Sequence, residues 1–343
     1  ATIGGYVATR SAGQASTGYG RADELVLGAR LATPAGELRL DAHAPASAAA
    51  PRLLDLVVGS EGALGVITEA TVRVAAYPKA TARGSWAFPS MDAATAALRE
   101  LAQHHGDASL PDVCRVSDPS ETQVSLTLAG GIGGRLLSYL RRRGLTEPAL
   151  GIFLWEGDSR VRVEQRRLGF ASTMLRHGAV RLPAAVAAAW QRGRFSGPYL
   201  RDELLDHRVL AETLETATTW DRLLPTYEAV RDALAAEFAA QGTPAVVQCH
   251  ISHVYAAGAS LYFTCVARTL ADPIEQWVRV KRAASGAIVA AGATITHHHA
   301  VGTDHLPWLG DEIGQLGLQV LRSVKDTLDP VGILNPGKLV PLR

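Results

Sequence analysis

Three consecutive histidines, His297, His298 and His299, follow an apolar stretch near the C-terminal end of the chain. Imidazole side chains titrate near neutral pH, so a row of them suits proton transfer or the stabilisation of a developing negative charge. Neighbouring residues of an extended segment point to alternate faces, so the three cannot all bind one metal ion in the usual way. We therefore predict a rim of active-site imidazoles that holds no metal, with a solvated loop as the alternative.

One tyrosine and two arginines are further candidates for chemistry. Tyr262 lies in an alternating segment, where a tyrosine more often packs with its hydroxyl bonded. To act as an acid or base, its pKa would have to fall well below 10, which requires a nearby cation or oriented donors. Arg201 could supply that charge, bind a phosphate or carboxylate through two hydrogen bonds, or simply pair with Asp202. Arg115 has the same ambiguity beside Asp118.

Two glycine-rich segments, residues 3–5 (Ile-Gly-Gly) and 61–65 (Glu-Gly-Ala-Leu-Gly), place glycine where the backbone must approach a partner closely or adopt a positive φ. Backbone N–H groups there could bind an anionic or planar ligand, and tight turns at strand ends are the alternative. No Gly-x-Gly-x-x-Gly opens a helix and no Gly-Lys-Ser/Thr occurs. The dinucleotide fingerprint and the phosphate loop are therefore excluded.

The composition is that of an ordinary globular protein, with 47% hydrophobic and 20% charged residues among 343. Its length predicts two domains or one large two-layer unit. The 34 basic and 33 acidic residues leave a net charge of +1, so no strong field attracts nucleic acid. No run approaches the roughly 18–20 apolar residues that a membrane span requires. The three cysteines, Cys114, Cys249 and Cys265, lack metal-site spacing and predict a reduced, cytoplasmic setting.

Hydrophobic patterns and turn residues predict strands separated by amphipathic helices. The predicted strands are 25–27, 38–40, 70–74, 86–88, 151–155, 245–254, 260–267 and 287–295. The predicted helices are 91–104, 159–177, 225–241, 272–285 and 312–328. Elements in this hairpin order favour an antiparallel sheet with helices on one face. His250 and His253, on the strand 245–254, are expected at the surface or lining a pocket.

Several segments together resemble the FAD-binding vanillyl-alcohol-oxidase superfamily. The glycine-containing blocks 2–13 and 59–71 resemble its FAD-binding domain, and 329–338 (Asp-Pro-Val-Gly-Ile-Leu-Asn-Pro-Gly-Lys) is similar to its C-terminal signature. Within the superfamily, the histidine triplet and three short blocks are most similar to the alkylglycerone-phosphate (alkyldihydroxyacetonephosphate) synthases. Those blocks are 155–158 (Trp-Glu-Gly-Asp), 198–202 (Pro-Tyr-Leu-Arg-Asp) and 323–325 (Ser-Val-Lys).

The resemblance implies an α+β fold in two parts. Residues 1–78 would form the C-terminal part of a FAD-binding domain, without the N-terminal half that binds the pyrophosphate. Residues 79–306 would form a substrate-binding cap domain with an antiparallel sheet covered by helices, and residues 307–343 would return to the FAD-binding domain. Because the chain begins without Met, we expect it to be a fragment of a longer protein, with a natural truncation as the alternative.

The resemblance also assigns roles to residues. Tyr262 would transfer a proton, Arg201 would bind the substrate phosphate, and Arg115 would be needed for activity beside the histidines. The expected FAD contacts are Thr2, Gly4, Gly5, Thr9, Arg10, Ser11, Ala12, Glu61, Gly62, Ala63, Leu64, Gly65, Val66 and Ile67.

The implied reaction exchanges the acyl group of acyl-dihydroxyacetone phosphate for a long-chain alcohol, with FAD as cofactor and no net redox change. Two alternatives stay open: a FAD-dependent D-lactate- or glycolate-type 2-hydroxy-acid dehydrogenase, and a non-catalytic binding remnant. The expected partner is a small-molecule or lipid substrate and not a nucleic acid. The resemblance leaves open peripheral contact with a membrane and a homodimer.

Overall fold

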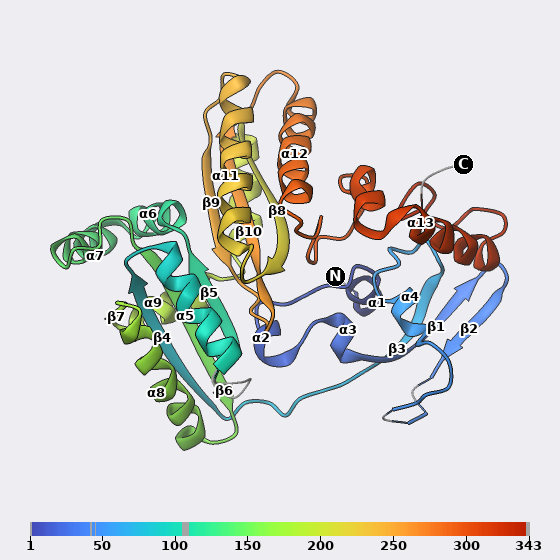
Figure 1. The fold of residues 1–343 in the computed structure, drawn as a ribbon, viewed down its shortest axis with the longest axis horizontal. Helices are drawn as coiled ribbons and strands as arrows, with labels where there is room; N and C mark the ends of the chain where they lie inside the picture. The colour runs from blue at the N-terminus through green and yellow to red at the C-terminus, as the bar shows by residue number, and fades with distance from the viewer. Residues whose placement is uncertain (1, 42, 45, 105–109, 341–343) are drawn as a thin grey trace. The chain divides into compact units, whose positions relative to one another are not determined.

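The computed structural model describes residues 2–41, 43–44, 46–104 and 110–340, and it divides into two compact units (Figure 1). The first unit comprises Ala1–Gly13, Tyr19–Ala75 and Ile295–Arg343, and the second comprises Gln14–Gly18 and Ala76–Thr294. The assignment of these regions to a FAD-binding domain and a cap stays a prediction. Residues 1 and 341–343 of the predicted FAD-binding domain lie outside the described residues.

The first unit is built on a three-stranded antiparallel sheet. The strand order is β2-β1-β3, formed by β1 (Val26–Thr33), β2 (Gly36–Leu40) and β3 (Val66–Val72). The predicted strands 25–27 and 38–40 fall in β1 and β2, or directly before β1, and the two strands form a hairpin whose turn precedes Gly36, which has a φ of 132°. The small core beneath the sheet includes Val7, Leu31 and Leu54.

Short helices and one long helix complete the first unit. The short helices are α1 (Ile3–Ala8), α3 (Ala22–Leu25), α4 (Leu54–Val57) and the 3-10 turn η1 (Leu306–Trp308). Of α2 (Ser16–Tyr19), only Tyr19 belongs to the first unit. The segment Ile3-Gly4-Gly5 opens α1 and is not a turn at the end of a strand. Helix α13 (Leu309–Leu328) is interrupted at Gly314, whose φ of 71° is incompatible with a continuous helix.

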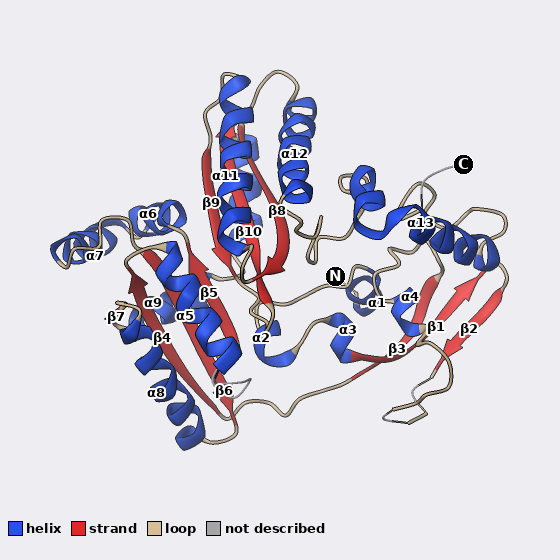
Figure 2. Cartoon of the chain, in the orientation of Figure 1, coloured by secondary structure: helices blue, strands red, loops and turns tan. Residues whose placement is uncertain are grey.

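The second unit contains a seven-stranded antiparallel sheet in the order β7-β4-β6-β5-β9-β10-β8 (Figure 2). Its strands are β4 (Ala80–Phe88), β5 (Val113–Ser117), β6 (Ala149–Gly157), β7 (Val180–Leu182), β8 (Val209–Thr219), β9 (Val246–Ile251) and β10 (Gly258–Arg268). All of their pairings are antiparallel. The predicted α+β class, with an antiparallel sheet covered by helices, is confirmed.

Eight helices of the described chain surround this sheet. They are α5 (Met91–His104), α6 (Pro119–Leu128), α7 (Gly130–Arg142), α8 (Arg160–Arg176), α9 (Ala184–Gly193), α10 (Gly197–Asp206), α11 (Leu223–Ala240) and α12 (Pro273–Ala290). Helices α11 and α12 pack side by side, with α11 over β9 and β10 (Figure 1). Within the described residues, no helix is both long enough and apolar enough to cross a membrane.

The expectation that helices cover only one face of the sheet is wrong for β6. Phe153 and Trp155 pack with Phe170 of α8, whereas Ile152 and Leu154 pack in a second cluster with Ala187 of α9. Strand β6 is therefore buried on both faces, as its continuous apolar run Ala149–Trp155 allows.

The predicted strand 287–295 is also wrong. Helix α12 starts at the N-cap Asp272 and continues through Ala290, and Gly292 with a φ of 68° ends the following turn. Alanine is the strongest helix former, and an Ala-rich apolar run without strict alternation does not distinguish a buried helix from a strand. The histidine triplet consequently lies in a bend, and the argument from alternating faces of an extended segment does not apply to it.

Candidate functional site

A row of polar side chains crosses four neighbouring strands of the second unit. Tyr262 on β10 pairs in register with His250 on β9 and with Glu215 on β8. His250 in turn pairs with Ser117 on β5, and Arg115 lies two residues earlier on the same strand. Since side chains two residues apart share a face, the sheet brings Arg115, His250 and Tyr262 together on one side.

Arg115, Glu121 and His250 form a closed hydrogen-bonded group, which we call the Arg–Glu–His group. Arg115 donates one bond to Glu121 Oε1 and a second, of 2.9 Å, to Nε2 of His250. His250 Nδ1 lies 3.1 Å from Glu121 Oε2. Because a guanidinium only donates, His250 Nε2 must accept, so the proton is on Nδ1 and the ring is neutral. The structure thus contradicts the pairing of Arg115 with Asp118.

The electrostatics agree with this protonation state. Burial lowers the pKa of His250, and the neighbouring Arg115 lowers it further. Burial alone would raise the pKa of the Glu121 carboxyl, but Arg115 and His250 together bring it to about 2. The group therefore holds one cation, one carboxylate and one neutral imidazole at neutral pH.

Tyr262 stacks on the His250 ring, with centroids 4.7 Å apart and planes 18° from parallel. Burial raises its pKa above 10, against the effect of a hydrogen bond with Thr213. The pKa reduction required for a resting phenolate is absent from this structure. Tyr262 is a neutral phenol here, with a proton to donate.

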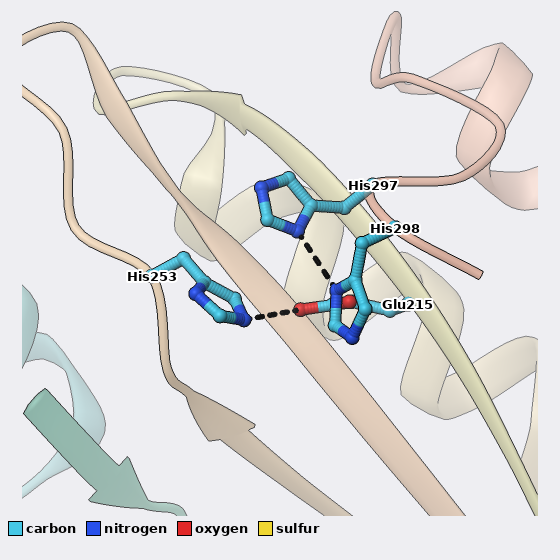
Figure 3. Close-up of side chains that lie close together, drawn as sticks. All are labelled: Glu215, His253, His297 and His298. Atoms are coloured by element: carbon cyan, nitrogen blue, oxygen red, sulfur yellow. Dashed lines mark hydrogen bonds and ion pairs between the residues drawn. The ribbon is translucent and has the colours of Figure 1, made fainter. Parts of the chain in front are cut away.

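A second buried pair extends the row. His253 Nε2 lies 3.7 Å from Glu215 Oε1 (Figure 3), and His253 Nδ1 shares a hydrogen bond with the hydroxyl of Ser16. His253 and Glu215 are 3% and 0% exposed, respectively. Of the two alternatives expected for His250 and His253, the surface position is wrong, because both side chains are buried and lie beside carboxylates, that of Glu121 on α6 and that of Glu215 on β8. The pocket-lining alternative stays a prediction.

The start of α6 positions Glu121. Asp118 is the N-cap, its Oδ1 accepts from the backbone N–H of Glu121 at 2.7 Å, and Tyr227 donates to its Oδ2 at 3.0 Å. Burial raises the pKa of Asp118 to about 6 despite these donors. Sequence reasoning missed Glu121, although Asp118-Pro119 followed by an acidic third residue is a typical helix start.

Arg201 lies apart from this group, on α10. It donates to Glu212 at 2.6 Å and to the carbonyl of Ala211 at 3.2 Å, and not to Asp202. Its side chain is 45% exposed. The structure does not show Arg201 bonded to Tyr262 or to the Arg–Glu–His group.

In the first unit, the three histidines form a compact bend, which we call the histidine turn (residues 296–302). The Nδ1 atoms of His297 and His298 are 3.2 Å apart (Figure 3). The rings of His298 and His299 pack edge to face, with their centroids 4.7 Å apart. The backbone N–H of His299 donates to Thr296 Oγ1 at 3.2 Å. Imidazoles in this arrangement can exchange or hold protons.

The expected FAD-contacting residues come from two segments that lie against each other in the first unit. The N–H of Gly59 donates to the carbonyl of Val7 at 3.0 Å, and the N–H of Glu61 donates to that of Ala8 at 2.8 Å. A Cβ added to Gly4 would lie 3.4 Å from the carbonyl oxygen of Ile67. The two glycine-containing segments, predicted from sequence separately, therefore form one surface with the strand that follows them.

Local contacts fix several of the other expected FAD-contacting residues. Thr2 caps α1 by accepting from Gly5 at 3.1 Å, Thr9 and Ser11 share a hydroxyl hydrogen bond of 2.7 Å, and Arg10 donates to the carbonyl of Val58. Ala12 follows in an irregular stretch.

The C-terminal signature is tied to the same surface. The buried Lys325 Nζ donates to the carbonyls of Ala63 and Leu334 at 2.7 and 2.5 Å and to Asp329 at 2.6 Å. Asn335 Nδ2 donates to the carbonyl of Glu61 at 2.5 Å. The Asp and Asn of the signature, together with Lys325, therefore hold the segment that contains Ala63.

Comparison with known proteins agrees with these features. The chain is 32% identical to alkyldihydroxyacetonephosphate synthase of Dictyostelium discoideum, across 99% of this chain and 57% of that protein. It is 27% identical to the mitochondrial D-lactate dehydrogenase [cytochrome] of Arabidopsis thaliana, again across 99% of this chain and 57% of the relative. A solved structure of alkyldihydroxyacetonephosphate synthase superimposes with a TM-score of 0.78 at 30% identity, covering 99% of this chain and 59% of the other.

The chain thus spans less than three fifths of the length of these relatives. Residues 77–339 match the family model described as FAD linked oxidases, C-terminal domain. This match covers most of the chain, and FAD is the cofactor of the family. The chain belongs to the FAD-linked oxidases.

Proposed function

We propose that this chain forms part of a FAD-dependent enzyme of the alkyldihydroxyacetonephosphate synthase type, which exchanges an acyl group for a long-chain alcohol. The observation that carries the proposal is the row on β5, β9 and β10, where Arg115 and the phenol of Tyr262 flank a neutral His250. Such a row offers a fixed positive charge and a transferable proton. The similarity to synthases over 99% of the chain supports this reaction class.

The first unit fits the role of holding FAD. Ser60 is 1% exposed, and within the described part of the chain its hydroxyl has no hydrogen-bond partner. A buried polar group of this kind requires an explanation, such as a bound group that completes its bonding. Gly59 and Gly62 on either side have φ values of 92° and 74°, so the backbone there can approach a ligand closely.

The residues that would hold FAD are Thr2, Gly4, Gly5, those of 9–12 and those of 61–67, together with Ser60. When bound, FAD supplies an electrophilic, redox-active ring beside the substrate. The chain's own residues would bind the substrate, orient it and move protons. Arg115 would stabilise negative charge on the substrate, because its guanidinium is permanently charged and only donates.

Tyr262 would donate and recover a proton at its Oη, since its raised pKa keeps the phenol protonated in the resting protein. The histidines 297–299 would serve as further proton carriers. Arg201 would bind the substrate phosphate, and for that its guanidinium would have to leave the Glu212 carboxylate or bond to both groups at once.

A reducing cytoplasmic setting with peripheral lipid contact belongs to the same proposal. The free, buried cysteines agree with such a setting.

The test has two stages. Visible absorption of the purified chain is recorded before and after FAD is added, and the holoprotein is then assayed with acyl-dihydroxyacetone phosphate and a labelled long-chain alcohol. We expect a bound-flavin spectrum and incorporation of the label into the product. A flavoprotein that incorporates no label would overturn the synthase assignment.

A 2-hydroxy-acid dehydrogenase is the second candidate. Arg115 suits a substrate carboxylate as well as a phosphate, and the D-lactate dehydrogenase of Arabidopsis thaliana matches the chain at 27% identity. The two candidates differ in redox balance. Bleaching of the bound flavin by D-lactate without oxygen would support the dehydrogenase, whereas turnover of the synthase substrates without net flavin reduction would support the synthase.

A further inference from the structure

The carboxylate of Glu61 reaches the backbone that directly follows the histidines. Its Oε1 accepts from the N–H of Val301 at 2.6 Å and its Oε2 from the N–H of Gly302 at 2.8 Å. All of these residues belong to the first unit, although about 240 positions separate them in sequence. Both carboxylate oxygens are therefore engaged by the histidine turn.

The conformation of the turn explains why two N–H groups meet one carboxylate. Ala300 and Gly302 have φ values of 64° and 55°, in the left-handed region. Left-handed residues in a short stretch direct successive N–H groups to the same side, and this concavity binds anions. Hydrogen bonds from N–H to a carboxylate are stronger than those between neutral groups. A non-glycine residue such as Ala300 adopts this conformation at a cost, which the bonds to Glu61 offset.

Glu61 is itself fixed from two other directions. Its N–H donates to the carbonyl of Ala8 in α1, and its own carbonyl accepts from Asn335 of the C-terminal signature. Its φ of 52° is positive, as are those of Gly59 and Gly62 in the same segment. The backbone of Glu61 is thus tied to the FAD-binding segments, while its side chain is tied to the histidine turn.

We propose that Glu61 is a positioning residue, which fixes the histidine turn relative to the FAD-binding segments and does not contact FAD through its carboxylate. The inference rests on the proposed function, in which the histidines carry protons in the reaction. One observation supports it directly: both carboxylate oxygens already accept strong hydrogen bonds, from the N–H groups of Val301 and Gly302.

The test uses the variants Glu61→Gln and Glu61→Ala of the full chain, with Glu69→Gln as the control. Glu69 is an exposed carboxylate on β3 in the same unit, and its ion pair with Arg30 is solvent-exposed. Hydrogen exchange is measured on the peptide that contains residues 296–303. We expect the N–H groups of Val301 and Gly302 to exchange at least about tenfold faster in Glu61→Ala, less so in Glu61→Gln, and unchanged in the control.

Two further readouts separate positioning from cofactor binding. FAD titration should give the same Kd as the unchanged chain within about threefold, and kcat should fall while KM for the substrate holds. Unaltered exchange in Glu61→Ala would overturn the proposal. If Glu61→Ala loses FAD binding while its histidine turn keeps slow hydrogen exchange, Glu61 is a FAD ligand and the proposal is also overturned. The exchange experiment requires no turnover, so failure of the synthase reaction leaves its result interpretable, and Glu61→Gln serves if Glu61→Ala does not fold.

Discussion

In the second unit, Arg115, Glu121 and His250 bond to one another through their side chains, on strands and at the start of a helix. In the first unit, Glu61 and Lys325 bond through their side chains to main-chain groups of distant loops. The two regions carry candidate site residues, yet they are held by different means. A strand ladder orients side chains without further help, whereas an irregular loop requires bonds to its own backbone.

The largest effect should come from the one side chain of the row whose proton we expect to move. Tyr262→Phe removes the hydroxyl and keeps the ring on His250, so we expect kcat to fall by about 10²-fold or more with FAD still bound. Steady-state kinetics and flavin absorbance check this. Tyr227→Phe is the control, because its hydroxyl bonds to Asp118, the N-cap of α6, and its loss should affect stability more than turnover. Full activity of Tyr262→Phe would show that the row is structural.

Removing one cation from each region compares the two means of support directly. Lys325→Met leaves the buried Asp329 carboxylate and two carbonyls without their shared donor, so we expect a loss of roughly 3–5 kcal/mol in the free energy of unfolding. Arg115→Met should cost less, roughly 2 kcal/mol, because His250 can take up a proton and remain a partner of Glu121.

Urea unfolding at pH 7 measures both losses. Arg162→Met, which breaks an exposed ion pair with Asp158, is the control and should cost less than about 1 kcal/mol. Equal losses for Lys325→Met and Arg115→Met would mean that the imidazole gives no compensation.

In the second unit, two carboxyl groups should change the free energy of unfolding in opposite directions as the pH rises. Glu121 has a folded pKa of about 2, below its unfolded value, so its contribution is present above pH 4.5 and is lost as the pH falls towards 2. Asp118 has a folded pKa of about 6, above its unfolded 3.8, so its stabilising proton is bound below pH 4 and is lost as the pH rises through 6.

One substitution tests the pH-dependent contribution of each carboxyl group. Asp118→Asn should abolish the fall in stability between pH 4 and 6, and Glu121→Gln should weaken the fall below pH 4.5. Unfolding midpoints measured from pH 3 to 8 check both. A profile unchanged by Asp118→Asn would contradict the raised pKa of that carboxyl.

The smallest effect on stability is expected for Arg201, which is exposed and bonds to two groups of β8, the carbonyl of Ala211 and the carboxylate of Glu212. Arg201→Ala should change the unfolding free energy by less than about 1 kcal/mol, yet weaken binding of a phosphorylated substrate by roughly 1.5–3 kcal/mol. Isothermal titration with the substrate tests this, with Arg192→Ala on α9 as control. Unchanged affinity would leave Arg201 a surface residue.

Local sequence signals predicted about half of the elements of the second unit, because these have clear hydrophobic patterns. The predicted elements are strands β4, β6, β9 and β10 and helices α5, α8, α11 and α12, whereas strands β5, β7 and β8 and helices α6, α7, α9 and α10 were not predicted. Tyr262 and Arg115 were identified by type, and their strands place them on one face. Their partners Glu121 and Glu215 were missed, because register between strands distant in sequence decides which groups meet. The stretch 287–295 failed for a different reason, since alanine is apolar at exposed and buried positions alike and so does not reveal the helical period of the end of α12.

The ladder between β8 and β10 has a bearing on folding fidelity. Its register runs without interruption from Gly258 opposite Thr219 to Arg268 opposite Val209, and a Cβ at Gly258 would lie 1.9 Å from the carbonyl oxygen of Thr218. A slip of one residue would turn Tyr262 into the apolar layer and bring Leu261 and Phe263 to the polar side. A chain with a larger residue at position 258 would therefore fold compactly with nearly native secondary structure and still be inactive. The cause would be the wrong register between β8 and β10, with every site residue still present in the sequence.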